Sequence, residues 1–506
     1  MKNLKKIFLL TLIAGAIYSC DDAYEIIQPG EYAEDVAILT LADMNLALSE
    51  VYDNISGEDI IGFTSVFTDE AAIGNENGGQ NLDEYRFQVF ANNGYASSIW
   101  LDNYRVINYA NRLIEASDNV VLDTLADDFE DQLQEKTRIL TEARVIRAFS
   151  HFQLLTYFST DLKNDSALGV ILMDHVPSSP PNLEQLPRST NGELFAFIDQ
   201  DLDYAQENFS TLANNGVVLI KPQFILGLRA RIAAYRGLYP EALAYAQQTL
   251  DIVQGNGLVT GETLTAATTA YRGVWTDTNI VSEVIFTLTR PTGKTGIVGN
   301  WFFNGASLAG GPFLDMSRSL YNQLVENNDV RLRVFVDNSS LIAEDYTTVF
   351  DYKNADVIVI DKYPGNTAQN LPLNNNIKVM RFVEMHFIKA EAQVAAGDLA
   401  GALTTINFVR EKRKATALPA FENAQQAWKA ILDERRMELS FEGHRYIDLK
   451  RLGTLAGVPG VQRYTRDCTP YSSCDLPVTD YRFTLPIPLD ELNGNAAIRS
   501  QQNPGY

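Results

Sequence analysis

The sequence predicts a mainly α-helical fold, in which tetratricopeptide-like helical hairpins form the scaffold and carry long loops and small β insertions. Three observations support this fold class. Apolar residues recur at helical spacing in several long segments. Alanine-rich pairs of such segments, joined by very short turns, occur twice, as in helical repeats of about 34 residues. The β-type runs are short and are separated by Gly, Asn and Pro.

The N-terminus has the pattern of a bacterial lipoprotein signal. Three lysines precede an apolar run over 7–17, which is too short to span a bilayer. A small residue directly before Cys20 resembles the lipobox, where a peptidase cuts before the Cys and the thiol is lipidated, although Ile17 stands where Leu is usual. The aspartates that follow resemble the surface-export signal of Bacteroidetes lipoproteins. We expect a signal peptide over 1–19 and a lipid-anchored acidic tether over 20–36; the alternative is an ordinary signal peptide with an incidental Cys.

Helices are expected over 39–52, 97–116 and 130–158, where apolar residues keep helical spacing. Trp100 lies within the second of these helices and is expected in the core. Residues 57–95 are rich in Gly and Asn and are expected to form a loop. No segment after the signal approaches the ~18 consecutive apolar residues of a transmembrane helix.

Two helical hairpins are expected further along the chain. In the first, helix 223–236 ends at Gly237, and Pro240 opens a helix that continues to Val253. In the second, apolar stripes over 385–395 and 399–409 flank a Gly-Asp turn. Small alanines let paired helices approach closely, so both segments resemble degenerate tetratricopeptide repeats.

Residues between these hairpins change character. Short β-type runs at 284–289 and 357–360 indicate small sheets that decorate the helical scaffold. We therefore expect one domain over 37–506, whose parts are an N-terminal half at about 37–254, a loop-rich excursion at about 255–380 and a C-terminal block at about 381–506.

The composition restricts the class of ligand. The chain has 41 basic and 64 acidic residues, a net charge of −23, so phosphate backbones are repelled and nucleic acid is a poor partner. Neutral ligands suit such a surface. The 23 Tyr and 25 Phe suffice for both a core and an exposed platform for sugars, although most aromatic rings are expected inside.

Cys468 and Cys474 close a short loop that contains a proline. In an oxidising exterior such a pair indicates a disulfide. The alternative, a metal site, would need more His or Cys nearby, and the chain has four His. No metal or cofactor is expected.

The C-terminal segment 428–451 combines apolar and charged residues on one helix. Arg435 shares an apolar face and needs a carboxylate partner, which Glu438 and Glu442 can supply. Gly443 is a natural end for this helix. We interpret the segment as a packed helix with a partly buried ion network, in which the carboxylates are structural and not catalytic.

The run from Glu434 to Leu449 also looks like the block of the SusD/RagB family that reads ERR-EL-FEG-RW-DL, with Tyr446 where Trp is common. Three further blocks agree in order. Residues 142–149 resemble the family's early EAR-LRA helix, 381–398 its R-AE-YL-AEA hairpin, and 485–506 its PIP…QNPGY terminus. The blocks extend over nearly the whole chain behind a lipoprotein signal.

This resemblance implies a function. Relatives are lipid-anchored on the outer face of the outer membrane and cover a SusC-like TonB-dependent transporter. They bind oligosaccharides, or peptides in the RagB kind, without cleaving them. Their helical repeats face the transporter, and the ligand binds on loops away from the repeats. We therefore expect oligosaccharide capture and delivery for uptake, with peptide binding as the alternative.

The residues themselves indicate which loops could bind the ligand. Three consecutive aromatic residues in a Gly-flanked loop are not expected to point all into a core, and a sugar can stack on such rings while amides bond its hydroxyls. The predicted contacts are therefore Asn300, Trp301, Phe302, Phe303 and Asn304. The alternative is that these rings pack down locally. Weaker candidates are Trp275, Tyr271 and Tyr95.

Signals of catalysis are weak. Gly293-Lys294-Thr295 suggests a phosphate loop, but Leu288 stands at the position of its first glycine and no helix is expected to follow. HExxH and GxSxG motifs do not occur in the sequence. A glycosidase would need two carboxylates facing each other across a cleft, which sequence alone does not test. We assign no catalytic residue, and a glycan-processing lipoprotein enzyme remains the rival of another class.

Overall fold

The structure is a computed structural model that describes residues 38–177, 184–212, 216–253, 257–260, 270–280, 283–290, 299, 302, 311–366, 371–372 and 374–506. Helices dominate, which confirms the predicted fold class. Within these ranges no helix combines the length and the apolar character that crossing a membrane requires.

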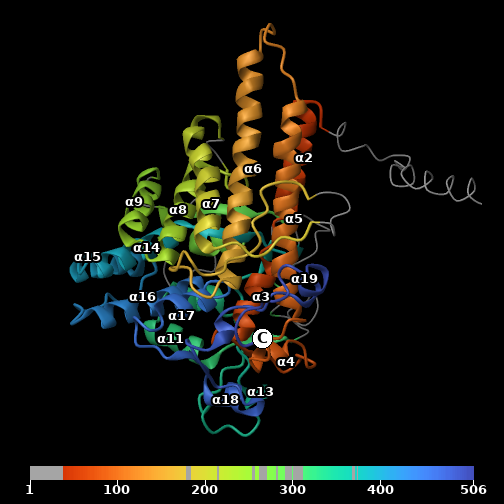
Figure 1. Ribbon diagram of the computed structural model, residues 1–506. Coiled ribbons are helices and arrows are strands. Elements are labelled where there is room, and N and C mark those ends of the chain that lie inside the picture. The colour runs from red at the N-terminus through yellow and green to blue at the C-terminus, as the bar shows by residue number, and fades with distance from the viewer. Residues whose placement is uncertain are drawn as a thin grey trace, which may run out of the picture.

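Long helices form the upper part of the molecule, and each packs on the next (Figure 1). The predicted hairpins are both present, as the pairs α8–α9 and α14–α15. The helices of this layer are α2 (Leu41–Asp53), α5 (Gly94–Ala116), α6 (Phe129–Phe158), α7 (Asn191–Glu207), α8 (Pro222–Arg236), α9 (Tyr239–Asp251), α14 (Phe382–Ala395) and α15 (Leu399–Lys412).

Local signals set the ends of these helices. Thr40 and Asp43 form a capping box at the start of α2, so two backbone N–H groups that lack helical partners are satisfied. Pro222 opens α8, and Gly237 ends it in the left-handed region at φ 75°. The alanines of α8 are buried, and this helix contacts α9 and α14 closely.

Further helices, most of them short, and loops form the lower part. They are α3 (Glu58–Phe67), α4 (Leu82–Tyr85), α10 (Ala270–Trp275), α11 (Arg318–Asn327), α12 (Val330–Phe335), α13 (Tyr352–Ala355), α16 (Ala424–Leu439), α17 (Arg445–Leu452), α18 (Thr465–Cys468) and α19 (Leu489–Gly494). The prediction that 57–95 is loop was therefore wrong for α3 and α4. Nearly every residue of α3 is buried, so the helix has no polar face and its sequence shows no amphipathic stripe.

Four antiparallel two-stranded sheets decorate the described helices. The run predicted at 284–289 is β2 (Val284–Leu288), which pairs with β6 (Ile377–Arg381). The run at 357–360 makes only isolated bridges, to Leu341 and Val336. The other pairs are β1 (Ala71–Ile73) with β3 (Leu314–Met316), β4 (Gly365–Asn366) with β5 (Leu371–Pro372), and β7 (Gly460–Gln462) with β8 (Asp475–Pro477).

The predicted end of the C-terminal helix needs correction. Helix α16 ends at Leu439 rather than at Gly443. Lys362 Nζ donates to the main-chain oxygens of Glu438 at 2.9 Å and Ser440 at 2.6 Å, so a buried cation takes the place of further helical donors. Gly443, at φ 86°, lies in the turn before α17.

Candidate ligand-binding site

The predicted ring contacts fall into two groups. Asn300, Trp301, Phe303 and Asn304 lie outside the described residues, as does the predicted lipidation site Cys20. Phe302 is described and is fully buried, with its ring centroid 5.0 Å from that of Phe441 and 6.2 Å from that of Tyr363. For this ring the local-packing alternative is correct.

The weaker candidates are also core residues. Trp275 and Tyr271 are 0% exposed and Tyr95 is 6% exposed, so none offers a free ring face to a sugar. Lys362 Nζ lies 4.3 Å from the centroid of the Trp275 ring, and Tyr271 donates from its hydroxyl to Glu438 Oε1 at 3.0 Å. These rings pack against buried charges, which explains why they lie near polar residues in the sequence without being exposed. Trp100 is buried, as predicted.

The charged residues of the C-terminal block form an internal ion network. Glu438 accepts from Arg413 Nε at 3.0 Å, from Arg413 Nη2 at 3.0 Å and from Arg381 Nη1 at 2.9 Å. Arg381 also pairs with Glu442 at 2.7 Å, and Glu434 pairs with Arg410 at 2.6 Å. Burial alone would raise the pKa of Glu438, but Arg413 and Arg381 outweigh it and hold that pKa well below its ordinary value.

Most of this network is enclosed, although Glu434 and Arg410 line a pocket of 280 Å³ beside α16. Every carboxylate and guanidinium in it is buried, and each is paired with opposite charge. Acids that are paired and enclosed are out of hydrogen-bond reach of a bound sugar. The predicted ion network is present, but its predicted pairing was wrong for Arg435, which pairs with Asp448 at 2.8 Å and Glu391 at 3.4 Å rather than with Glu438 or Glu442.

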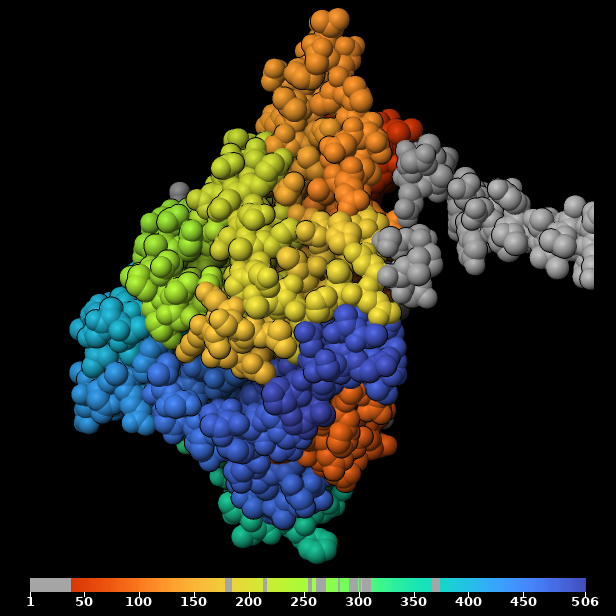
Figure 2. Space-filling view, in the orientation of Figure 1, coloured from red at the N-terminus to blue at the C-terminus, as the bar shows by residue number. Residues whose placement is uncertain are grey.

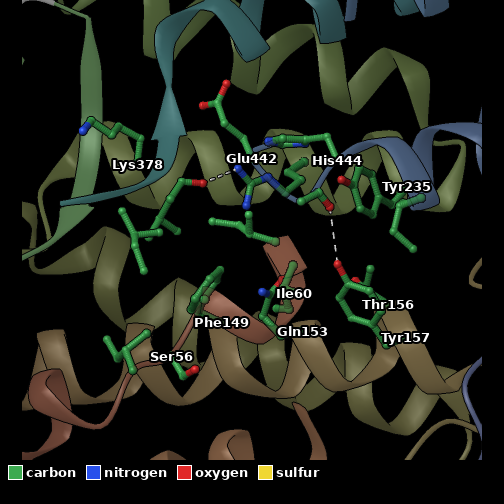
Figure 3. A pocket seen from close by; sticks show the side chains of 18 residues that line it. Ser56, Ile60, Phe149, Gln153, Thr156, Tyr157, Tyr235, Lys378, Glu442 and His444 are labelled. Atoms are coloured by element: carbon green, nitrogen blue, oxygen red, sulfur yellow. Dashed lines mark hydrogen bonds between the residues drawn. The ribbon is translucent and has the colours of Figure 1, made fainter. Parts of the chain in front are cut away.

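Beside Glu442 lies a small internal cavity of 60 Å³ (Figure 3). Thr156 and Tyr157 of α6 face His444 and Glu442 across it, and Tyr157 donates to the main-chain oxygen of Gly443 at 3.4 Å. Burial, with Arg231 and Arg435 nearby, lowers the pKa of His444 to about 4. The cavity has room for a few water molecules but not for a sugar.

Loops from three distant parts of the sequence meet at the lower end of the molecule, opposite the tip between α5 and α6 (Figures 1 and 2). We call residues 74–85, 311–313, 338–356 and 464–475 the distal loop surface. Asn77 Nδ2 donates to the main-chain oxygen of Phe313 at 3.0 Å, and Asn75 Nδ2 donates to Asn354 Oδ1 at 3.4 Å. Amide side chains therefore bind these loops to one another.

The distal loop surface carries aromatic rings that are open to solvent. Phe350 is 100% exposed; Phe90, which is 60% exposed, lies outside this surface, next to Ala91, whose main-chain oxygen accepts from the N–H of Leu489 at 2.8 Å. Tyr471 is partly exposed; its hydroxyl accepts from Lys353 Nζ at 2.9 Å, and Tyr85 packs edge-on against its ring at 5.3 Å. Exposed rings beside amides and cations are what a sugar needs for stacking and for hydroxyl hydrogen bonds.

A disulfide between Cys468 and Cys474, as predicted from the sequence, closes the loop that carries Tyr471. Arg466 donates to the main-chain oxygens of Tyr346 at 3.0 Å and Val349 at 2.6 Å. The two contacts tie the loop bearing Phe350 to the disulfide loop. The distal loop surface is thus held by covalent and charged links, in addition to the packing of Tyr471 against buried Tyr85.

A second hollow, which sequence reasoning missed, lies between α5, the segment 171–177 and α19. This cavity measures 600 Å³. Tyr104, Asn108 and Asn111 of α5 line one side, and Asp490 and Asn495 line the other. The spacing of Tyr104, Asn108 and Asn111 on one helix face was visible in the sequence, but the facing residues come from hundreds of positions away.

The sequence and the fold both match known proteins. The profile described as "SusD family" matches residues 298–506, and the one described as "Starch-binding associating with outer membrane" matches residues 38–224. The chain belongs to the SusD family. The predicted resemblance is therefore confirmed, and the blocks that carried it lie within these two matched ranges.

Individual SusD-family relatives are similar over nearly the whole chain. SusD-like protein P2 from Formosa agariphila is 24% identical, with 100% of both chains covered. A SusD superfamily protein from Bacteroides thetaiotaomicron has a TM-score of 0.72 at 24% identity and covers 92% of this chain and 100% of that one. A structure named "Laminarin binding SusD-like protein" has a TM-score of 0.67 at 20% identity, covering 93% of this chain and 100% of that one. At these identities the structural matches show the shared fold.

Proposed function

We propose that this protein captures a neutral oligosaccharide at the cell surface and delivers it, uncleaved, to a SusC-like TonB-dependent transporter. The observation that carries the proposal is the group of exposed rings and amides on the distal loop surface. A similar fold that binds laminarin and a matching family described as starch-binding support a glycan as the ligand.

The enclosed acids of the C-terminal block support binding without cleavage, although the distal loop surface also carries the exposed acids Glu344 and Asp351. The carboxylates of the C-terminal block are enclosed in ion pairs and cannot reach a sugar on the distal loop surface. Glycoside hydrolysis needs two carboxyl groups facing the scissile bond, with separations of about 5 to 9.5 Å. The proposal assigns the distal loop surface to binding alone.

The placement on the outer membrane follows from the N-terminus. Cys20 after a signal-like segment supports lipidation, and the acidic residues behind it support export to the cell exterior. The family described as associating with the outer membrane agrees with this location. Replacing Cys20 with Ala should release the protein from the membrane fraction; a variant that stays membrane-bound would contradict the lipid anchor.

The binding proposal is tested by removing exposed rings. Phe350→Ala should weaken glycan binding by about 1 kcal/mol, or roughly fivefold, because a ring contact is lost without disturbing the core. Trp301→Ala, at a position predicted from the sequence, should do the same. Calorimetric titration with laminarin and starch oligosaccharides measures the affinities.

The matched control is Leu125→Ala. Leu125 is 91% exposed, like the rings, but lies in the connection between α5 and α6 at the opposite end (Figure 1). This variant should bind as the unmodified protein does. If Phe350→Ala binds normally, the distal loop surface is not the binding site.

A further inference from the structure

The cavity between α5 and α19 has no role in the proposed function, yet it has the size and lining of a ligand pocket. Its volume of 600 Å³ falls within the range of about 300 to 1,000 Å³ in which small-molecule sites occur. Ile107, Ile171, Met173 and Leu186 provide apolar lining, and the Tyr104 ring adds an aromatic wall. Polar side chains from α5 and α19 join them.

Hydrogen bonds fix the wall formed by α5. The Tyr104 hydroxyl donates to the main-chain oxygen of Ile171 and accepts from its N–H, both at 2.8 Å. Asn111 Nδ2 donates to the main-chain oxygens of Met173 at 3.2 Å and His175 at 2.8 Å, while its Oδ1 accepts from buried Arg147 at 2.7 Å. The wall is therefore preorganised, which lowers the entropy cost of binding.

The opposite wall is fixed as well. Glu491 accepts from Trp100 Nε1 at 3.2 Å and from Asn495 Nδ2 at 3.1 Å. Asn495 also donates to the main-chain oxygen of Leu186 at 2.8 Å. The bond from Trp100 holds α19 against α5, and the bond to Leu186 fixes the adjoining loop, so hydrogen bonds define this side of the cavity.

The charges around the cavity largely cancel. His175 lies between two carboxylates, with Nδ1 2.6 Å from Asp174 and Nε2 2.7 Å from Glu184. Those hydrogen bonds raise the pKa of His175, which favours its cationic form. Arg105 pairs with Asp102 at 3.0 Å. Most acids near the cavity are already paired, so they would attract a cationic ligand only weakly. Asp490 and Glu491 would repel an anionic ligand.

Unpaired hydrogen-bond donors and acceptors nevertheless remain in the lining of the cavity. Asn108 Oδ1 accepts from Arg112 Nε at 3.1 Å, and its amide N–H groups have no partner in the described part of the chain. Asp490 is exposed and has no intramolecular hydrogen bond or ion pair to any described residue. One free donor and one free acceptor, beside apolar walls and an aromatic ring, match a neutral molecule with hydroxyl groups and a C–H face.

We propose that the cavity between α5 and α19 is a second saccharide site, which takes a short neutral sugar segment independently of the distal loop surface. The ligand class rests on the proposed function, but the site does not. Two separate sites on one protein raise the avidity for a long glycan whose chain can span both.

The test fills the cavity. Asn108→Trp places a bulky ring inside it, and Asn103→Trp places the same ring on α5 at a partly buried residue that does not line it. Both are made in a Phe350→Ala background and titrated with maltotriose and laminaritriose. The affinity for at least one of the two trisaccharides should fall at least tenfold with Asn108→Trp and stay unchanged with Asn103→Trp. Thermal melting checks that both variants are folded.

The two proposals fail in different ways. If Asn108→Trp leaves trisaccharide binding intact while Phe350→Ala weakens it, the cavity is not a site and the distal loop surface is. If Asn108→Trp alone removes binding, the cavity is a site and the distal loop surface is not. If trigalacturonate or a chitosan trimer, an anion and a cation, binds in the cavity more tightly than both neutral sugars, the assigned ligand class is wrong. If no neutral trisaccharide binds the unmodified protein, both proposals are overturned.

Discussion

Replacing Glu438 with Gln tests whether the charged C-terminal helix is architecture. The substitution keeps the shape of the side chain and removes its charge. Arg413 and Arg381 each lose a partner at about 3 Å, and the amide then presents N–H groups to guanidinium groups that cannot accept. Tyr271, whose hydroxyl donates to Glu438, is affected as well.

The expected cost is large because the site is fully buried. Breaking a buried ion pair by removing one partner costs about 3 to 5 kcal/mol, since the remaining charges are left incompletely compensated. Urea unfolding followed by tryptophan fluorescence measures the free energy of unfolding; Trp275, which lies over Lys362 and Arg381, reports directly on the network. Glycan affinity in native conditions should be unchanged.

The control lies on the same helix. Asp433 pairs with Lys429 at 2.5 Å, but both side chains are solvent-exposed or nearly so. Asp433→Asn should therefore cost less than about 1 kcal/mol. If Glu438→Gln costs no more than Asp433→Asn, or if it abolishes binding while stability is kept, the structural interpretation of this helix is refuted.

Three further changes have defined outcomes. Burial raises the pKa of Glu70 to about 8. The ionisation of Glu70 therefore opposes folding increasingly as the pH rises from the unfolded pKa near 4. Urea unfolding should show that Glu70→Gln stabilises the protein by on the order of 3 kcal/mol at pH 7 and by little at pH 4. The pKa of His175 is raised by Asp174 and Glu184, so its contribution is present at low pH and is lost as the pH rises through the folded pKa; His175→Gln should lower the melting temperature at pH 5.5 and have less effect at pH 8.5. Cys474→Ser should reduce stability by on the order of 2 kcal/mol, as a seven-residue loop loses its link, and should weaken binding at the distal loop surface; equal stability with and without reductant would contradict this.

Much of the scaffold could be predicted from the sequence. The turn at Gly237 and the alanine stripes of α8 report directly on helix ends and close packing, because both depend on residues near each other in the chain. The ion network could be anticipated only in part: Glu438 lies on α16, but Glu442 lies beyond the end of this helix, and Arg435 pairs with Asp448 and Glu391 instead. The sequence did not reveal that Arg381 and Arg413 are the partners of Glu438, because both come from other elements of the fold.

The binding surfaces were harder to predict, because exposure depends on tertiary neighbours. Trp275 looked available in the sequence but lies over Lys362 and is buried. Phe350 and Phe90 have no sequence feature that separates them from core phenylalanines, yet both rings are open to solvent. A ring becomes a platform only when the fold leaves its face uncovered, and that is decided by segments far away in the chain.

The most direct test of the account combines binding and product analysis in one experiment. The purified protein is titrated calorimetrically with laminarin and starch oligosaccharides, and the recovered sugar is then separated by chromatography. The account predicts saturable binding, weakened by Phe350→Ala, with every oligosaccharide recovered at its original length. The account would be contradicted if the unmodified protein released shorter fragments and if replacing an exposed acid abolished that release.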